Sequence, residues 1–544
     1  MSIRSIPYFW MGHAFSSLCF IVSSILIAET PGHAEGKPDS ILPLQTNVLA
    51  PQPSSIPSVR NAEIYVEQLK LYRERFDAKA QHLSLADSVQ IGLTKSPLLG
   101  AAYSSIQQAE YTLTSKIRQN YPSLTLSDLQ PFLGKVYTSD YSTTRSQSST
   151  LQYNNENDTY IPVTSTVSDS TSSQEQYYQF APYFTLTWTF FNPTLWAQTS
   201  ASQQDVYRER LSFDVSARGL LLNIQEAYLE VQSNYYLVKS FEEIFSINQD
   251  QVNYVEARYN AGLSNIGELD QSKNQLFQQA SELVEYYQQY FASAFKLAAL
   301  LDLPQNSIVI PKTPLAKEGS WTLPLDDTVQ QALTLREEIM VYLAEADADI
   351  WNARAAMREY LPEFSFQGFA YGYYEWDGST KSSSSGVEPY QSTYKNGAWG
   401  LGVTWNIFDF GVYAAESQSY EASAKQKKFQ ADSERLTVKK QVRVAYATYE
   451  AAKDLVYLSE QSVLAAEAYL ASTKARYKVG LDNMVAITQA MQSLGTAIRS
   501  KSDALVKYNL SVAKLYRYSA LWPPNILPFD SVYNSAKDLQ PISN

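Results

Sequence analysis

The side chains best suited to chemistry lie beside two turns of matching sequence. Each turn reads Arg-Tyr, two variable residues, then Gly-Leu; the members are Arg258, Tyr259 and Gly262 in the first turn and Arg476, Tyr477 and Gly480 in the second. Carboxylates follow each turn, namely Glu268 and Asp270, then Asp482. Carboxylates that converge attract cations and raise one another's pKa. The alternative is that the glycines only connect helices and the acids are solvated helix ends.

The sequence contains few of the histidine and cysteine residues that many enzymes use for catalysis. His82 is the only histidine beyond residue 34, and the single cysteine, Cys19, lies in the apolar start of the chain. A histidine-based triad, a metal cluster or a disulfide therefore lacks its residues. A glycine-rich phosphate loop with its lysine is also missing from the sequence. We predict no catalytic residues, no metal and no cofactor.

Composition narrows the class of protein further. The 544 residues carry a net charge of −12, only 18% are charged, and 40 are tyrosines. A nucleic-acid-binding protein normally has a basic stripe, which this sequence lacks. The aromatic content suits strands and loops that meet a membrane interface.

The beginning of the chain predicts export from the cytoplasm. Residues 1–34 combine Arg4, an apolar stretch and a small-residue ending at Ala34, which is the pattern of a signal peptide. The alternative, an N-terminal anchor, is weaker because the apolar stretch is shorter than a spanning helix needs. Residues 35–82 are predicted to form a Pro/Ser-rich leader followed by an additional helix from Asn61 to Gln81.

The remainder of the chain is an internal duplication. Residues 83–303 align with residues 323–521, joined by a connection at 304–322 and followed by a tail at 522–544. Each half predicts helix, strand, loop, strand and very long helices. The first helices, Leu83 to Asn120 and Leu323 to Tyr360, each end before a proline. Residues 138–173 and 378–395 are predicted as loops.

Four segments alternate apolar and polar residues, as strands do. They are Leu124 to Leu129, Phe180 to Phe190, Phe364 to Tyr374 and Trp399 to Ile407. Their length and their tryptophans, Trp188, Trp399 and Trp405, favour membrane strands over a soluble sandwich, which four strands cannot build alone. A change of phase near Gly368 predicts a bulge.

The long helices carry a seven-residue apolar pattern. Positions from Leu220 to Val252 and from Val438 to Leu470 step by four and three in turn. A sustained 3.5-residue period predicts left-handed coiled packing. A helix from Trp196 to Arg258 would be about 95 Å long at about 1.5 Å per residue, which requires side-by-side packing into a tube or stalk.

Taken together, these features resemble the TolC-like outer-membrane efflux family. The resemblance runs from Leu83 to Leu521 and depends on the order of the duplication, the helix-Pro-strand junctions and the paired turns. It implies an α+β membrane protein: a homotrimer that pools four strands per chain in a 12-stranded outer-membrane β-barrel, continued by a periplasmic barrel of coiled-coil helices. It also implies docking of a periplasmic adaptor and an inner-membrane pump or ABC exporter at the tapered end.

The resemblance assigns roles at that end residue by residue. Glu268 matches an entrance acid, and Tyr477 matches the tyrosine bonded to it when the entrance is closed. The chain departs from the family where Ala486 and Gln489 replace an acidic ring and Asp482 replaces an arginine.

The function predicted from these features is an outer-membrane channel of an efflux pump or a type I secretion system, without enzymatic activity. The alternative is a periplasmic coiled-coil adaptor or a structural envelope protein. Adaptors also use long helical hairpins, but the two tryptophan-bearing strand pairs speak against both alternatives.

Overall fold

A computed structural model describes residues 59–78, 80–127, 132–142, 146–167, 170–304, 307–382, 386–524, 526 and 529–539. The predicted signal peptide and the Pro/Ser-rich leader up to residue 58 lie outside the described residues. Among the described helices, none is both long enough and apolar enough to cross a membrane.

Two very long helices run through the helical part of the chain. They are α4 (Pro193–Asn260) and α8 (Val412–Lys478), and each is followed by a shorter antiparallel helix, α5 (Ile266–Leu300) and α9 (Met484–Tyr518). The remaining helices are α1 (Val59–Asp77), α2 (Leu85–Lys95), α3 (Pro97–Arg118), α6 (Leu325–Leu335), α7 (Glu337–Arg358) and α10 (Phe529–Lys537). The additional N-terminal helix predicted from Asn61 to Gln81 corresponds to α1, which ends four residues earlier.

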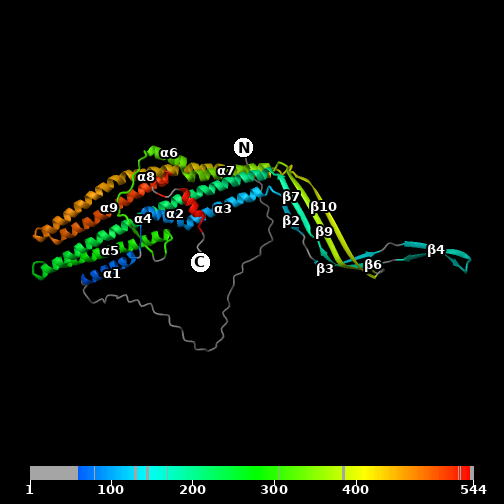
Figure 1. Ribbon diagram of the computed structural model, residues 1–544, viewed down its shortest axis with the longest axis horizontal. Coiled ribbons are helices and arrows are strands. Elements are labelled where there is room, and N and C mark those ends of the chain that lie inside the picture. The colour runs from blue at the N-terminus through cyan, green and yellow to red at the C-terminus, as the bar shows by residue number, and fades with distance from the viewer. Residues whose placement is uncertain are drawn as a thin grey trace, which may run out of the picture. The chain divides into compact units, whose positions relative to one another are not determined.

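The helices pack in rows four wide (Figure 1). On the side of the turns the order is α5, α4, α9, α8, and on the side of the strands it is α3, α4, α7, α8. Helix α8 therefore forms one edge of both rows, and α5 and α3 form the other edge. Helix α1 packs on α5, at that second edge.

The predicted heptad positions are buried. Every position of the two series is less than 10% exposed, from Leu220 to Val252 on α4 and from Val438 to Leu470 on α8. Small residues such as Ala445 and Ala452 on this seam let neighbouring helices approach closely. The predicted coiled packing of the long helices is confirmed.

The first helix of each repeat is broken, so the prediction of single helices from Leu83 and from Leu323 was wrong. Ser96 separates α2 from α3 in an extended conformation, because the residue before Pro97 is sterically kept out of the helical region. Arg336 separates α6 from α7 in the same conformation without a proline. Its guanidinium instead donates to Glu338 and to the carbonyl of Tyr518 at the end of α9.

The strands form a sheet with four positions across its width. We call each position a strand-path, because two of them are each occupied by two successive strands. The first path is β2 (Ser123–Ser127) and β3 (Phe132–Ser142), and the second is β6 (Ser170–Phe180) and β7 (Tyr183–Phe191). The third and fourth are β9 (Glu363–Ser382) and β10 (Gly386–Thr404). The order β2, β7, β9, β10 repeats the order of the helices that adjoin them, α3, α4, α7 and α8.

Pairing in the sheet leaves two free edges. Strands β2 and β3 pair with β7 and β6, and β10 pairs with β9. Within the described residues, the outer sides of β2, β3 and β10 have no strand partner. A separate hairpin, β4 (Ser146–Asn154) with β5 (Thr159–Val167), and a short parallel pair, β1 (Gln81–Leu83) with β8 (Val309–Pro311), complete the strands.

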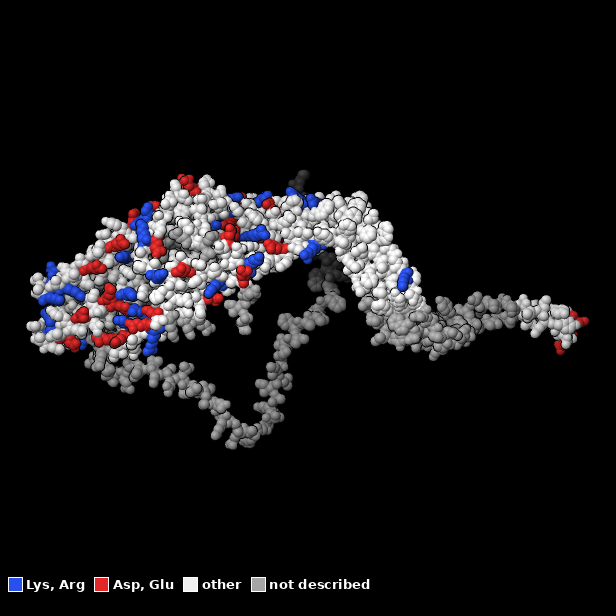
Figure 2. All heavy atoms as spheres, viewed as in Figure 1, with Lys and Arg blue, Asp and Glu red and all other residues white. Residues whose placement is uncertain are grey.

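The sheet has one apolar and one polar face. Register places the exposed side chains of Leu126, Phe184, Trp399, Leu401 and Val403 on one face. The other face carries the small or polar residues Ser123, Thr125, Thr185, Thr187, Ser365, Gln367, Gly400, Gly402 and Thr404. Charged side chains gather over the helices, whereas the described surface of the strands is almost free of them (Figure 2).

Two expectations for the strands need correction. The segments predicted as loops, 138–173 and 378–395, are largely strand, because polar residues there pair across hairpins that extend β3, β6, β9 and β10. Gly368 is not a bulge, since the β9–β10 register runs through it without a shift and places it opposite Trp399. The change of phase instead puts Phe369, Tyr371 and Tyr373 on the polar face.

Candidate functional site at the paired helix turns

Both predicted turns end a long helix with the same hydrogen bonds. Gly262 and Gly480 have φ of +72° and +78°, the left-handed region that glycine adopts without strain. The N–H of Leu263 donates to the Arg258 carbonyl at 2.8 Å, and the N–H of Leu481 donates to the Arg476 carbonyl at 2.9 Å. This six-to-one bond is the Schellman ending, which explains the shared Arg-to-Leu spacing.

An asparagine starts the next helix after each turn. The Asn265 side chain accepts from the Glu268 N–H at 2.8 Å, and the Asn483 side chain accepts from the Ala486 N–H at 3.0 Å. These caps satisfy helix N–H groups that otherwise have no partner. They also fix Glu268 in the first turn of α5, where a negative charge is favoured.

The structure brings Tyr477 and Glu268 together. The hydroxyl of Tyr477 lies 3.5 Å from Glu268 Oε2, and Ser264 donates to the same oxygen at 2.5 Å. Tyr477 itself is buried, at the end of α8, so this contact joins the α8–α9 hairpin to the α4–α5 hairpin. Burial raises the pKa of the Tyr477 hydroxyl, and the negative charge of Glu268 raises it further.

Arg258 is the residue of this site that sequence reasoning underused. Its guanidinium lies 5.2 Å from the ring centre of Tyr477 and 5.9 Å from that of Tyr254, and it donates to the Leu263 carbonyl at 3.1 Å. A cation over two aromatic faces holds both rings in place. The recurrence of Arg-Tyr in both turns was the available signal, but the partner ring belongs to the other repeat.

The second turn does not reproduce the contact. The equivalents of Tyr477 and Glu268 in the alternate repeat are Tyr259, which is exposed, and Ala486, which has no acceptor group. Asp482 pairs with Arg476 of its own turn at 2.8 Å, and Asp270 is exposed on α5. The predicted acids therefore do not converge within one chain.

The predicted membrane tryptophans mark the junction of strands and helices. The indole N–H of Trp188 donates to the Asn120 carbonyl at 2.9 Å, and that of Trp405 donates to the Tyr360 carbonyl at 2.9 Å. These are equivalent bonds in the two repeats, each to the helix end that precedes a strand. Trp399 lies farther along β10, where it is 79% exposed and stacks on Phe366. Exposed indoles with one bonded end are typical of a membrane interface.

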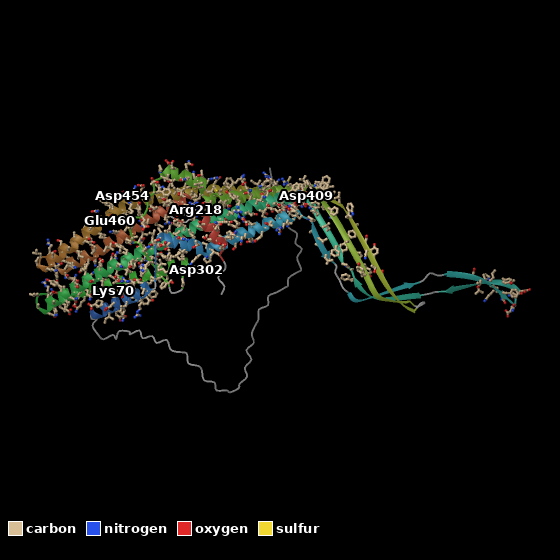
Figure 3. The ribbon with its side chains drawn as sticks, in the orientation of Figure 1. Lys70, Arg218, Asp302, Asp409, Asp454 and Glu460 are labelled. Atoms are coloured by element: carbon tan, nitrogen blue, oxygen red, sulfur yellow. The ribbon has the colours of Figure 1, made fainter. Side chains whose placement is uncertain are left out.

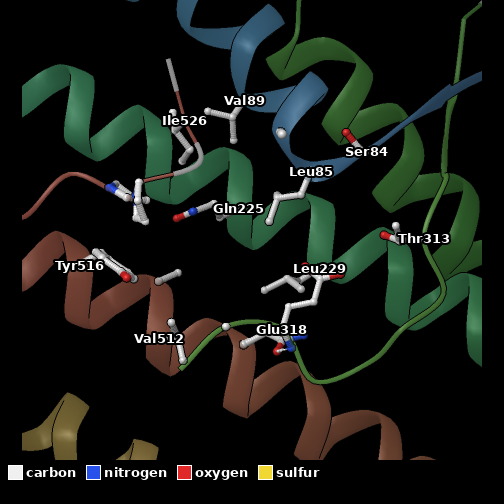
Figure 4. A pocket seen from close by; sticks show the side chains of 16 residues that line it. Ser84, Leu85, Val89, Gln225, Leu229, Thr313, Glu318, Val512, Tyr516 and Ile526 are labelled. Atoms are coloured by element: carbon white, nitrogen blue, oxygen red, sulfur yellow. Dashed lines mark hydrogen bonds between the residues drawn. The ribbon is translucent and has the colours of Figure 1, made fainter. Parts of the chain in front are cut away.

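A cavity that sequence reasoning missed lies among the helices, far from the turns in sequence. It has a volume of about 340 Å³ and is lined largely by apolar side chains of α2, α4 and α9 and by the tail near Pro523 (Figure 4). Burial raises the pKa of Glu318 at its rim. The lining contains neither a nucleophile with an adjacent base nor a cluster of metal ligands, so we assign it no chemistry.

The sheet has an exposed apolar face with tryptophans at its border, and long helices packed four wide adjoin it. These features define a protein that spans a membrane by strands and extends from it by helices. The chain belongs to the Outer membrane efflux protein family, which matches residues 89–302 and 328–520. The chain is 21% identical to the outer membrane protein TolC of Vibrio cholerae over 334 residues. This alignment covers 59% of this chain and 72% of that protein.

Solved structures agree in fold. The CmeC outer membrane channel of Campylobacter jejuni superposes with a TM-score of 0.61 at 14% identity, covering 84% of this chain and 90% of that one. The MtrE outer membrane channel of Neisseria gonorrhoeae, solved in an open state, gives 0.56 at 16% identity, covering 80% and 89%.

Family membership confirms several predictions. The chain has the TolC-like fold and is an outer-membrane channel of efflux systems that extends into the periplasm. The family is one of channels and not of enzymes, in agreement with the predicted lack of catalytic activity. The alternatives of a periplasmic adaptor or a structural envelope protein are therefore wrong.

Proposed function

We propose that three copies of this chain form one continuous export duct through the outer membrane and across the periplasm. The observation that carries the proposal is the pair of free edges on a two-faced sheet. In lipid every backbone hydrogen-bonding group needs a partner, and four strand-paths cannot close on themselves. Closure requires that β10 of one copy pair with β2 and β3 of the next, with the apolar face toward lipid and the polar face toward the lumen.

The helices support the same closure. Because their order follows that of the strands, the edges to be joined in the helical rows lie on the same sides as the free strand edges. Helix α8 of one copy would then meet α3 and α5 of its neighbour. The two aligned repeats, residues 83–303 and 323–521, would form equivalent segments of the wall of this tube.

We further propose that the paired turns form the periplasmic entrance, where a periplasmic adaptor and an inner-membrane pump or ABC exporter dock. A duct without a nucleotide-binding motif takes its energy from such a partner. Type I secretion and small-molecule efflux both fit a passive duct of this kind.

The contact between Tyr477 and Glu268 holds this entrance closed in the proposal. This hydrogen bond joins the two hairpins beside the turns, and Arg258 keeps the tyrosine ring in place. Loss of the hydrogen bond frees the α8–α9 hairpin to move away from α4 and α5.

The test is single-channel recording of the purified protein in planar lipid bilayers. We expect the wild type to give small unitary currents and the double variant Glu268→Ala/Tyr477→Ala to give currents severalfold larger. Tyr259→Ala is the matched control, because Tyr259 occupies the equivalent turn position without an acid beside it, and its currents should equal those of the wild type. Unchanged currents in the double variant would refute the gate, whereas no currents from any form would refute the duct.

A further inference from the structure

Helix α1 precedes the first repeat and is firmly attached to the rest of the chain. Arg73, which is buried, pairs with Glu242 of α4, and Tyr287 of α5 donates to the same carboxylate. Tyr290 donates to Asp77 at 3.3 Å. Removing one partner from a buried ion pair is strongly unfavourable, so these bonds fix α1 against α4 and α5.

Aromatic packing fixes the same face of α1. The ring of Tyr72 lies 5.2 Å from that of Phe291, and Phe76 lies 5.5 Å from Phe291 and 5.9 Å from Phe295. Residues with higher numbers on α1 contact residues with higher numbers on α5, so the two helices run parallel. Helix α1 is thus a rigid addition to one edge of the helical row.

A second face of α1 is not covered by the described part of its own chain. Ile64 and Leu71 are 43% and 49% exposed, and Tyr65, next to Ile64, is 50% exposed. Ile64 and Leu71 are separated by seven residues, which aligns their side chains along the helix as in a coiled-coil seam. A solvated helix rarely repeats large apolar residues at this spacing on a second face.

The opposite edge of the row carries a complementary apolar surface. On α8, the side chains of Leu455, Tyr457, Leu458 and Leu464 are exposed. Their level along the tube can be traced from α1 through neighbouring contacts. Arg73 meets Glu242, the adjacent Phe241 contacts Gly495 of α9, and Tyr508 of α9 contacts Tyr449 of α8. Because α9 and α8 are antiparallel, going back along α9 from Tyr508 to Gly495 corresponds to going forward along α8 by the same number of residues from Tyr449. The part of α8 at the level of Arg73 is therefore residues 458–464.

We propose that α1 is an inter-subunit clasp whose exposed face packs against α8 of a second copy of this chain. The inference builds on the proposed trimer, in which the α5 edge of one copy meets the α8 edge of the next. Charges of both signs flank the two apolar surfaces, namely Glu67, Lys70 and Glu74 on α1 and Lys453, Asp454 and the half-buried Glu460 on α8 (Figure 3). The pairing therefore depends on the apolar side chains, at the same level of the two helices, and not on opposite net charge. The rigid attachment of α1 to α4 and α5 means that little conformational entropy is lost when the clasp engages.

Site-specific photocrosslinking in intact cells tests the clasp. Leu71 is replaced by benzoylphenylalanine in the full chain, and irradiation is expected to give a band of twice the chain mass, with the linked peptide mapping to α8. Leu69, which packs toward its own chain, is the matched position and should give only internal links. A Leu71 product with residues 1–58, with another protein or with no partner at all overturns the clasp.

A second variant separates loss of the clasp from loss of the trimer. The substitution Ile64→Ser/Leu71→Ser should lower the temperature at which the purified trimer dissociates, while Val485→Ser, which removes an exposed apolar side chain from α9 in the middle of the row, should not. Equal dissociation temperatures for the double variant and the wild type overturn the clasp. If the wild type has the native mass of one chain, the proposed assembly fails as well.

Discussion

Asp214 on α4 shows how a single carboxyl group responds to its surroundings in this protein. Burial, together with the negative charge of Glu337, raises its pKa to about 7, although the positive charge of Arg218 opposes both effects. Arg218 is committed elsewhere, because its Nε donates to Glu337 Oε1 at 2.7 Å. Glu337 Oε2 is buried without a hydrogen-bond partner in the described part of the chain. The site therefore holds more negative charge than its cation balances.

A raised carboxyl pKa costs stability at high pH. The unfolded group ionises near its ordinary value, whereas the folded group resists ionisation until about pH 7. The cost is fully present above the folded pKa, falls as the pH drops toward the unfolded pKa, and is absent below it.

Asp214→Asn should therefore raise the thermal unfolding temperature at pH 8 and leave it nearly unchanged at pH 4. The gain is on the order of 1 kcal/mol, because partial solvent screening reduces the effect of the shift. Calorimetry at the two pH values measures it. Asp347→Asn, at an exposed position of α7, is the control and should show no difference between the two. A gain at pH 4 as large as that at pH 8 would mean that ionisation of Asp214 is not its cause.

At the scale of elements, β10 shows how alternation assigns the two faces of a strand. Leu401 is 76% exposed on the apolar face, and its neighbour Gly400 lies on the polar face with open space around it. The lipid-facing side of a strand excludes charge, whereas the side facing water accepts it.

Leu401→Arg should reduce the amount of protein inserted in the outer membrane, because a charged side chain facing lipid costs about 2–4 kcal/mol near the bilayer midplane. Gly400→Arg places the same charge one residue away on the other face and should leave insertion close to that of the wild type. Membrane fractionation followed by immunoblotting compares the two variants. Equal insertion would contradict the assignment of the faces.

At the scale of the whole molecule, the free edges of sheet and helices lie on matching sides of one chain. An open edge in lipid is an unstable end state, so assembly and membrane insertion are expected to be one process. The lone chain should accordingly be difficult to isolate in a folded, membrane-inserted form.

The native mass of the detergent-solubilised protein tests this assembly. We expect a single species of three chains, because twelve strand-paths close the barrel. Light scattering after size exclusion, or native mass spectrometry, reads the number directly. A folded, membrane-derived species of one or two chains would show that the edges are closed in another way.

Local features of this protein could be predicted from residue spacing alone. The seven-residue spacing predicted which residues of α4 and α8 are buried, because neighbours on a helix face are set by a fixed rise and turn. Alternation predicted the strand segments beside Trp188 and Trp405 for the same reason. The left-handed glycines at 262 and 480 ended the helices where the repeated turn motif placed them.

Features that depend on partners distant in the sequence could not be predicted from spacing. Arg336 breaks a helix whose apolar pattern continues, because its bonds to Glu338 and Tyr518 outweigh the local preference. The polar stretches predicted as loops became strands, since the gain comes from backbone pairing across the sheet and not from an apolar pattern. Tyr477 and Glu268 lie 209 residues apart, and no spacing rule joins them; the family resemblance alone paired them, and the structure shows the contact. The free face of α1 became visible only when its other face was seen to be occupied.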